Sequence, residues 1–258
     1  MKFLWIIVAA ILTALVSAAL HASSDGTVLP RTAASPAKAT LSQSGPVVAE
    51  LFTSQGCSSC PPADAVLARL ARDPAILVIS RPVTYWDRLG WKDSLGREEN
   101  TRLQRQYGDT AFGGANIYTP QLVVDGATQG VGSQEANARK LIAHASTLRQ
   151  RNGVAVRVSR SADGGGRVMI EGKAGAGAEV VLVALSAHET VSIGRGENGG
   201  RTVSYTNVVI DETRLGRWTG GKQAIALRAE QLATPRADRY ALIVREAAGR
   251  KVIGSAVI

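Results

Sequence analysis

Short apolar runs alternate with helical spacing along the first half of the chain. Val47 to Phe52 is a mostly apolar run, which is typical of a strand buried on both faces of a sheet. Ala63 to Ala71 has its apolar residues on one helical face, and Ala75 to Ser80 is a second apolar run. This order of strand, helix and strand predicts a βαβ unit with a right-handed crossover.

A second group of elements follows a loop rich in aromatic residues. Arg97 to Tyr107 has the pattern of a charged helix, and Gln121 to Asp125 that of a strand. Asp125-Gly126 is a strong hairpin signal, so Thr128 to Val131 is the predicted returning strand. A helix is predicted from Ser133, as its N-cap, to about Arg149.

The pattern changes after residue 153, where short β-rich runs are separated by glycine-rich turns. Strands at such regular spacing are typical of a β-sandwich or a barrel. The predicted fold class is therefore α/β: a domain over residues 46–150 with a mixed sheet flanked by helices, then a β-rich, sandwich-like domain over 153–258. The predicted strands of the second domain are Val154–Ser159, Val168–Glu171, Val180–Leu185, Thr202–Ile210, Ala224–Leu227, Tyr240–Val244 and Val252–Val257.

The composition is that of a globular protein, with 45% hydrophobic and 20% charged residues among 258. The formal net charge is +9, but lysine and arginine are scattered along the chain. Nucleic-acid binders more often gather basic charge on one face with aromatic residues between. We therefore expect no nucleic-acid partner, and the charge leaves an acidic partner or membrane headgroups as alternatives.

The N-terminal segment has the features of an export signal. Lys2 precedes a nearly all-apolar run from Phe3 to Leu20, and small residues allow cleavage after Ala19 or Ala22. We expect a signal peptide over residues 1–22, a linker over 23–45, and a periplasmic or secreted protein. An uncleaved membrane anchor is the alternative, and only then would the protein contact a membrane.

The two cysteines of the chain, Cys57 and Cys60, form a Cys-x-x-Cys between the first predicted strand and helix. This placement is typical of a thioredoxin-like redox motif. We expect Cys57 to be the exposed attacking thiol, with a pKa below the free value of about 8.5, and Cys60 to resolve the mixed disulfide. A purely structural disulfide is the alternative, since an oxidising compartment alone favours one.

Three further side chains are candidates for the same site. Glu50 is the only charge in its predicted strand, and it could accept the proton of Cys60 during resolution. Tyr85 and Trp86 could line a substrate groove, although such aromatics more often pack a loop onto the core.

The sequence predicts neither a metal site nor a cofactor. The three histidines have no cysteine or histidine at ligand spacing. Glycines 194, 196 and 199 match a dinucleotide fingerprint by letter. A strand rather than a helix is predicted to follow them, so we reject nucleotide binding there.

Several motifs in order resemble a family of exported, thioredoxin-like bacterial proteins of unassigned function. They are the residues from Leu51 to Asp64 around the cysteines, Tyr85-Trp86-Asp87 with Leu89 to Asp93, Tyr118 to Gln121, and Gly194 to Asn198. The resemblance runs from about Pro46 to the C-terminus. It is specific for the family and much less informative about an activity.

The resemblance implies a thioredoxin-like fold in which a cis-proline faces the Cys-x-x-Cys. Thr119-Pro120 occupies that position, and Thr119 would offer its backbone to an extended substrate. One departure is Pro61-Pro62, because a proline pushes the residue before it towards an extended conformation. We therefore expect Cys60 to be extended and the helix to begin only at Pro61 or Pro62.

The function predicted from these features is that of an exported protein exchanging disulfides with protein thiols, or with a redox partner protein, through Cys57 and Cys60. Its rival is a non-enzymatic envelope module that binds a partner and has a structural disulfide. The sequence leaves open whether the protein is an enzyme.

Overall fold

The computed structural model describes residues 44–258, apart from residues 174 and 249. The predicted signal peptide and most of the predicted linker lie outside the described residues. The first elements are β1 (Val47–Thr53), α1 (Pro61–Leu70), β2 (Ile76–Pro82), a 3₁₀ turn (Asp87–Leu89), α2 (Glu98–Thr110), β3 (Gln121–Val124), β4 (Thr128–Val131) and α3 (Glu135–Asn152). The later elements are β5 (Ala155–Arg160), β6 (Gly166–Gly172), β7 (Ala178–Ser192), β8 (Thr202–Trp218), β9 (Gly221–Leu227), a 3₁₀ turn (Ala229–Leu232), β10 (Arg239–Glu246) and β11 (Val252–Val257).

The predicted helices and strands of the first half are confirmed in kind and order, but the N-cap of α3 is Gln134 and not the predicted Ser133. Strands β1 and β2 are parallel and joined through α1, as a βαβ unit requires. The turn between β3 and β4 has positive φ at both central residues, 48° at Asp125 and 61° at Gly126. Ala127 N–H donates to Val124 O at 3.0 Å, and a β-turn of this type needs both central residues in the left-handed region, which aspartate and glycine tolerate.

The described strands form a large mixed sheet and a small second sheet. The eight-stranded sheet has the order β11-β10-β7-β8-β2-β1-β3-β4, and the three-stranded sheet the order β5-β6-β9. The second half of the chain is β-rich as predicted. Four of its strands extend the sheet of the first half. Side chains of β5 and β6 share a buried apolar cluster with β7, β10 and β11, and a sandwich-like second domain stays a prediction. The domain division near residues 151–153 stays a prediction, and the large sheet continues across it.

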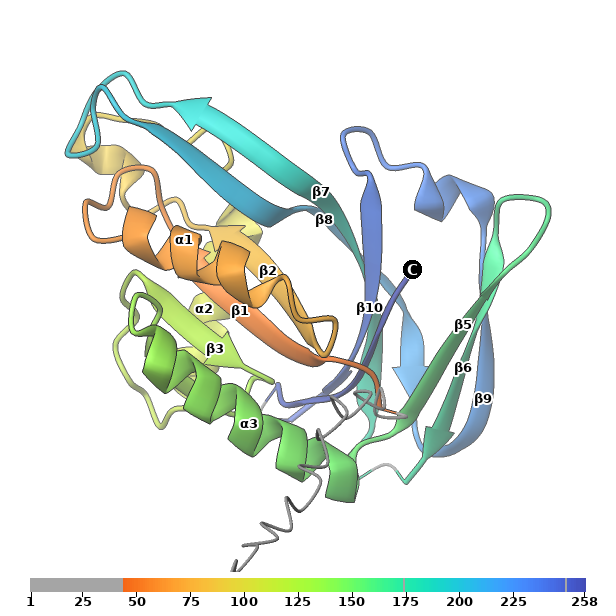
Figure 1. Cartoon of the computed structure of the whole chain (residues 1–258). Helices are drawn as coiled ribbons and strands as arrows, with labels where there is room; N and C mark the ends of the chain where they lie inside the picture. The colour runs from red at the N-terminus through yellow and green to blue at the C-terminus, as the bar shows by residue number, and fades with distance from the viewer. Residues whose placement is uncertain (1–43, 174, 249) are drawn as a thin grey trace, which may run out of the picture. The chain divides into compact units, whose positions relative to one another are not determined.

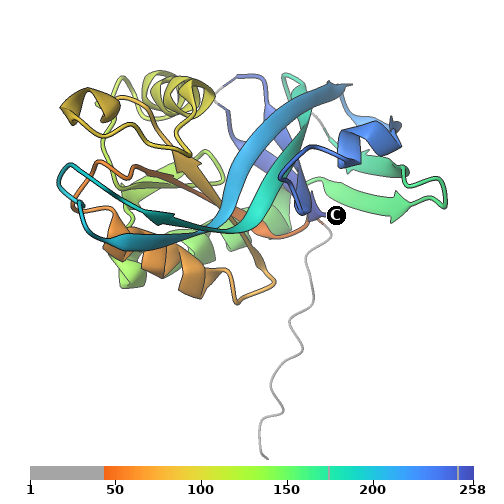
Figure 2. The ribbon, with the colours of Figure 1, turned by 90° about the horizontal axis from the view of Figure 1, so that it is seen from above.

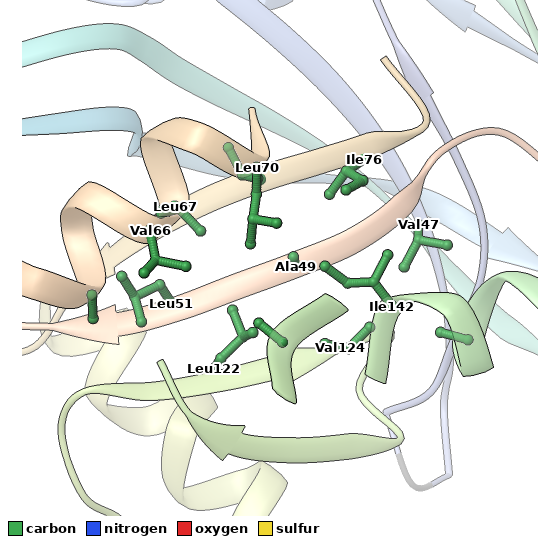
Figure 3. Packing of buried hydrophobic residues seen from close by; sticks show 14 residues of the cluster. Val47, Ala49, Leu51, Val66, Leu67, Leu70, Ile76, Leu122, Val124 and Ile142 are labelled. Carbon is green, nitrogen blue, oxygen red and sulfur yellow. The ribbon is translucent and has the colours of Figure 1, made fainter. Parts of the chain in front are cut away.

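The helices cover both faces of the large sheet, as Figure 2 shows. On one face, α1 and α3 pack against alternate residues of the central strand β1, among them Ala49 and Leu51 (Figure 3). On the other face, Phe52 of β1 packs with Leu103 and Tyr107 of α2. Strand β1 is buried along its whole length, because α1 and α3 cover one face, while on the other face Phe52 meets α2 and Val48 packs with apolar strand residues such as Val183.

A buried ion cluster joins the two halves of the chain beneath α2. Its members are Glu50 of β1, Arg81 of β2, Tyr107 of α2, Glu212 of β8 and Arg245 of β10. Arg81 Nε donates to Glu50 Oε1 at 2.6 Å, and Arg81 Nη2 donates to Glu212 Oε1 at 2.7 Å. Arg245 Nη2 lies 3.3 Å from the same Glu50 oxygen. Tyr107 donates its hydroxyl to Glu50 Oε2 at 2.5 Å.

The cluster contains two cations and two carboxylates, so its charges balance. Burial disfavours the charged form of Glu212, but Arg81 and Arg245 outweigh that cost and lower its pKa. Burial raises the pKa of Tyr107, which therefore stays a hydrogen-bond donor. Removing one member would leave an uncompensated charge, which is far more costly than the intact cluster.

We expect Arg245→Met to destabilise the fold by about 3 kcal/mol, because Glu50 loses one of its two cations without access to water. Urea denaturation measures this cost. The control is Arg157→Met, whose partner Glu171 lies 3.9 Å away in an exposed pair, and it should cost less than about 0.5 kcal/mol. Equal effects of the two substitutions would show that the cluster does not join the halves energetically.

Candidate functional site

The Cys-x-x-Cys lies where β1 leads into α1, and Cys57 and Cys60 form a disulfide with their Cα atoms 5.4 Å apart. The helix begins at Pro61, as predicted, but Cys60 is not extended: its φ and ψ are −78° and −41°. A proline at the first helical position loses no hydrogen bond, since its missing N–H has no intrahelical acceptor. The Cys60 carbonyl accepts from Ala63 and Asp64, which fixes the helical conformation.

The prediction that Cys57 is the exposed cysteine is wrong for the disulfide form. Cys57 is 1% exposed and Cys60 0%, whereas Ser58 and Ser59 between them are exposed. Tight backbone bonds turn the segment inward: Cys57 N–H donates to Ser54 O at 3.2 Å, and Cys60 N–H to Cys57 O at 3.1 Å. A partner therefore meets the serines before it meets the sulfur atoms.

The tip of the long β7–β8 hairpin is the second component of the site. We call residues 193–201, between the two strands, the hairpin tip. It is closed by a bond from Ile193 N–H to Arg201 O at 2.8 Å. Figure 1 shows this end of the hairpin beside the loop that precedes α1. A segment predicted to belong to a second domain thus reaches the cysteines.

Two adjacent side chains of the hairpin tip bind the backbone around the cysteines. Asn198 is fully buried, and its Nδ2 donates to Cys57 O at 2.8 Å and to Gln55 O at 3.0 Å. Glu197 is exposed, and its Oε2 accepts the N–H of Ser58 at 3.1 Å. The second half of the chain thus holds the Cys-x-x-Cys turn through these hydrogen bonds.

The predicted aromatic residues lie in the loop after β2 and are partly buried. Tyr85 and Trp86 pack against the apolar cluster beneath α2. They thus pack their loop onto the core, which was the alternative to lining a substrate groove. Trp86 also donates its indole N–H to Thr119 Oγ1 at 2.8 Å. The neighbouring Trp91 donates its own to Gln55 Oε1 at 2.8 Å. The aromatic loop thus joins Thr119 to the residues just before Cys57.

The peptide bond between Thr119 and Pro120 is cis, which confirms that prediction. Pro120 lies close to the first turn of α1. A Cβ placed on Gly132 would be 3.2 Å from Ala63 Cβ and 3.6 Å from Pro120 Cβ. Within the described residues, no hydrogen bond engages the backbone N–H or carbonyl of Thr119. The structure therefore brings Thr119, Pro120 and the start of α1 together.

Glu50 does not lie on the same face of the sheet as the cysteines. Its neighbours Ala49 and Leu51 face α1, so strand alternation directs Glu50 to the opposite face, towards α2. There its carboxylate is bound by the ion cluster described above. Sequence alternation correctly groups Glu50 with Phe52, but it does not reveal which face receives α1. The structure gives no support to proton exchange between Glu50 and Cys60.

A different buried carboxyl, Asp64, lies on the cysteine side of the sheet. It follows Cys60 by four residues on α1, so the two side chains share a helix face with Cβ atoms about 5–6 Å apart. Thr53 donates its hydroxyl to Asp64 Oδ2 at 3.2 Å, while Oδ1 has no hydrogen-bond partner among the described residues. Burial raises the pKa of Asp64 well above its usual range. The charge of Asp93 adds to this, and the bond from Thr53 opposes it.

Asp93, in the aromatic loop, anchors the segment that leads to the cysteines. Its carboxylate accepts the N–H of Gln55 at 2.8 Å and that of Leu95 at 2.9 Å. Burial raises the pKa of Asp93 to about 6, against the opposing effect of these backbone bonds. Burial also raises the pKa of Tyr205 on β8, and the charges of Asp64 and Asp93 add to that shift. Two carboxyls with raised pKa thus lie near the disulfide.

Asp64 and Asn198 are the functional candidates that sequence reasoning missed. For Asp64 a signal exists, since the spacing of four from Cys60 places it on the same helix face. For Asn198 the only signal is the resemblance carried by Gly194 to Asn198, because no local spacing links it to Cys57.

No group of three or more histidine, cysteine, aspartate or glutamate side chains in the described part of the chain is arranged to hold a metal ion. Among the same residues, no helix has the length and apolar character needed to cross a membrane.

Comparison with known proteins gives a family and two similar structures. A crystal structure of an Agrobacterium tumefaciens protein from the Northeast Structural Genomics Consortium is 30% identical, with a TM-score of 0.72. That similarity covers 84% of this chain and 94% of the other. HBP35 of Porphyromonas gingivalis is 12% identical, with a TM-score of 0.55 over 83% of this chain and 74% of that chain, and this likeness shows the fold alone.

No curated protein matches the chain. A family model does match, over residues 48–245, which include both cysteines, the cis-proline and the hairpin tip. The chain therefore belongs to the family described as "Protein of unknown function (DUF1223)".

Proposed function

We propose that this protein is a thioredoxin-like thiol–disulfide exchange protein that uses Cys57 and Cys60. The observation that carries the proposal is a Cys57–Cys60 disulfide at the start of α1, with cis-Pro120 beside the same helix turn. The topology supports it: β1 is parallel to β2 and antiparallel to β3, which begins directly after the proline. The position of the cysteines at a helix N-terminus also supports the proposal, because the helix dipole stabilises a thiolate there.

The exchange starts from the oxidised protein. A substrate thiolate attacks Cys57 Sγ, the bond between the two sulfurs breaks, and Cys60 leaves as a thiolate that takes up one proton. A second substrate thiolate then attacks the substrate sulfur of the mixed disulfide, which forms the substrate disulfide and releases Cys57 as a thiolate. The protein has gained two electrons and the substrate dithiol has become a disulfide. The same steps in reverse reduce a substrate disulfide.

Asp64 is the group that exchanges the proton with Cys60 in this proposal. It lies on the cysteine side of the sheet, it is buried, and one of its oxygens has no partner among the described residues. Its raised pKa supports the role, because proton transfer is most efficient between groups with similar pKa values. Glu50, on the opposite face, keeps a structural role in the ion cluster.

Substrate recognition at Thr119 fits the same proposal. The backbone of Thr119 forms no hydrogen bond within the described residues, while its side chain is fixed by Trp86. An extended peptide could therefore pair with this backbone by strand addition and present its sulfur to Cys57. This interaction is independent of sequence, so it suits protein thiols of varied context.

Export belongs to the proposal as well. The predicted signal peptide would place the protein in the periplasm or outside the cell, where a disulfide persists. The partner there would be a protein thiol, a protein disulfide or a redox partner protein.

The rival function is that of an envelope module with a structural disulfide. The burial of both cysteines favours it, because a disulfide of this kind is shielded from attack. The two functions differ in how the single cysteines react.

In the proposed exchange, Cys57 must react while the fold is intact. We expect reduced Cys60→Ser protein to form a stable mixed disulfide with oxidised glutathione in the absence of denaturant. The matched Cys57→Ser protein should react at least ten times more slowly, because the Ser59 hydroxyl lies 3.3 Å from Cys57 Sγ and can stabilise the thiolate of Cys57. Mass spectrometry over time measures both rates. Absence of reaction at Cys57 until the protein is unfolded would favour the structural disulfide.

If Asp64 is the proton acceptor, Asp64→Asn should slow resolution of the mixed disulfide by about 10- to 100-fold, in the range of general base catalysis. The pH dependence of the rate should also flatten, since the titrating carboxyl is gone. Glu50→Gln is the comparison and should leave the resolution rate of the folded protein unchanged. Slow resolution in Glu50→Gln with a normal rate in Asp64→Asn would reverse the assignment.

The raised pKa of Asp64 also predicts an effect of pH on stability. In the unfolded chain the carboxyl ionises near its usual pKa of about 3.9, while in the folded protein it stays protonated to higher pH. Its contribution is thus fully present below about pH 3.9 and is lost as pH rises through the raised value. The stability of Asp64→Asn relative to wild type should therefore increase as the pH is raised from acidic to alkaline values. Denaturation at each pH measures this difference. If the difference in stability between the two proteins stays constant across this pH range, folding does not raise the pKa of Asp64.

A further inference from the structure

We propose that the hairpin tip is part of the redox site, and that Glu197 and Asn198 are positioning residues that set the reactivity of Cys57. This inference rests on the proposed function and adds a control element from the second half of the chain. Its basis is a set of three hydrogen bonds to the backbone of residues 55–58.

Asn198 supplies the rigid part of the contact. Its side chain is fully buried, and one amide nitrogen donates to the carbonyls of Gln55 and Cys57. The bonded residues are more than 140 positions apart in sequence, 143 for Gln55 and 141 for Cys57. Arg201 Nη1 donates to the Asn198 side-chain oxygen at 3.1 Å, which fixes the orientation of the amide. The Asn198 side chain therefore fixes the position of Cys57 by binding the backbone carbonyl of Cys57.

Glu197 supplies the charge. Its carboxylate accepts the N–H of Ser58, the residue that directly follows Cys57. Hydrogen bonds from Ser58 lower the pKa of Glu197, so it is ionised at neutral pH. The 3.1 Å bond and the covalent geometry of the two residues place the carboxylate within about 9 Å of Cys57 Sγ. This is less than a Debye length of about 10 Å in 0.1 M salt.

A negative charge at this place opposes the formation of a second one. Cys57 lies ahead of the N-terminus of α1, where the helix dipole favours a thiolate. The carboxylate of Glu197 reduces that advantage by repulsion and by occupying the Ser58 N–H. The other charged side chains on the surrounding elements include buried Asp64 and Asp93 and exposed Lys92 and Arg195. All of these stay unchanged when Glu197 alone is replaced.

With Glu197 in place, the Cys57 thiolate of the reduced protein is less stable than it would be with the helix dipole acting alone. A less stabilised thiolate makes the disulfide harder to reduce. A partner that draws the hairpin tip away, or neutralises Glu197 with a cation of its own, would make Cys57 more reactive at the moment of binding. The matching partner surface therefore carries a lysine or arginine beside its reacting cysteine.

The test uses Glu197→Gln, which keeps the size of the side chain and removes its charge. In the reduced protein, we expect the pKa of Cys57 to fall by about 0.5 unit at low salt, as ultraviolet absorbance of the thiolate measures it. The difference should shrink in 1 M salt, where the Debye length is about 3 Å. The matched control is Glu230→Gln, a carboxylate in the 3₁₀ turn before β10 that is 81% exposed, and it should leave the pKa of Cys57 unchanged.

Asn198→Ala tests the rigid part of the contact. We expect the disulfide of this variant to be reduced by dithiothreitol at least three times faster than in the wild type, because the Cys57 turn loses two hydrogen bonds. If this variant fails to fold, Glu197→Gln still decides the inference. An unchanged Cys57 pKa in Glu197→Gln at low salt would overturn it.

The two proposals can fail separately. A Cys57 thiol that never reacts in the folded protein would reject the exchange function, while the effect of Glu197 on its pKa could still be measured. A reactive Cys57 that is indifferent to Glu197 would keep the exchange function and reject the role of the hairpin tip.

Discussion

The carboxylate of Glu50 is buried in the middle of the central strand and is held by Arg81 from the next strand and Arg245 from near the end of the chain. Neither cation can leave without exposing an unpaired charge to the interior. Strands β2 and β10 must therefore stay where they are relative to β1. Because β10 pairs with β7, the same constraint fixes the long hairpin of β7 and β8. The carboxylate of Glu50 thus links the two halves, together with the Arg81–Glu212 pair and the apolar cluster that both halves share.

This arrangement explains why the candidate site around Cys57 and Cys60 is built from both halves of the chain. Strand β1 and helix α1 position the cysteines, and the loop before β3 positions Thr119 and Pro120. The β7–β8 hairpin, which the ion cluster anchors, extends to the C-terminal end of β1. There the hairpin tip binds the backbone of Cys57 and Ser58. The strands after residue 153 therefore supply part of the site in addition to extending the sheet. Their joint contribution distinguishes this site from a Cys-x-x-Cys on an isolated βαβ unit.

Local features of the site could be predicted from sequence, and long-range ones could not. The apolar run before Cys57 and the start of the helix at Pro61 follow from patterning and proline geometry. The orientation of Glu50 could not be predicted, because alternation defines two faces without saying which one receives α1. The burial of Cys57 could not be predicted either, since it accompanies contacts with Asn198, 141 positions away.

We propose that the Cys57–Cys60 disulfide is exchanged in function and is more than a structural link. The reduction potential of the pair in the purified protein, at equilibrium with a glutathione or dithiothreitol buffer, distinguishes the two roles. For a disulfide that is exchanged, we expect a potential between about −270 and −120 mV, the range of exchange proteins. A potential below about −300 mV, typical of structural disulfides, would contradict it.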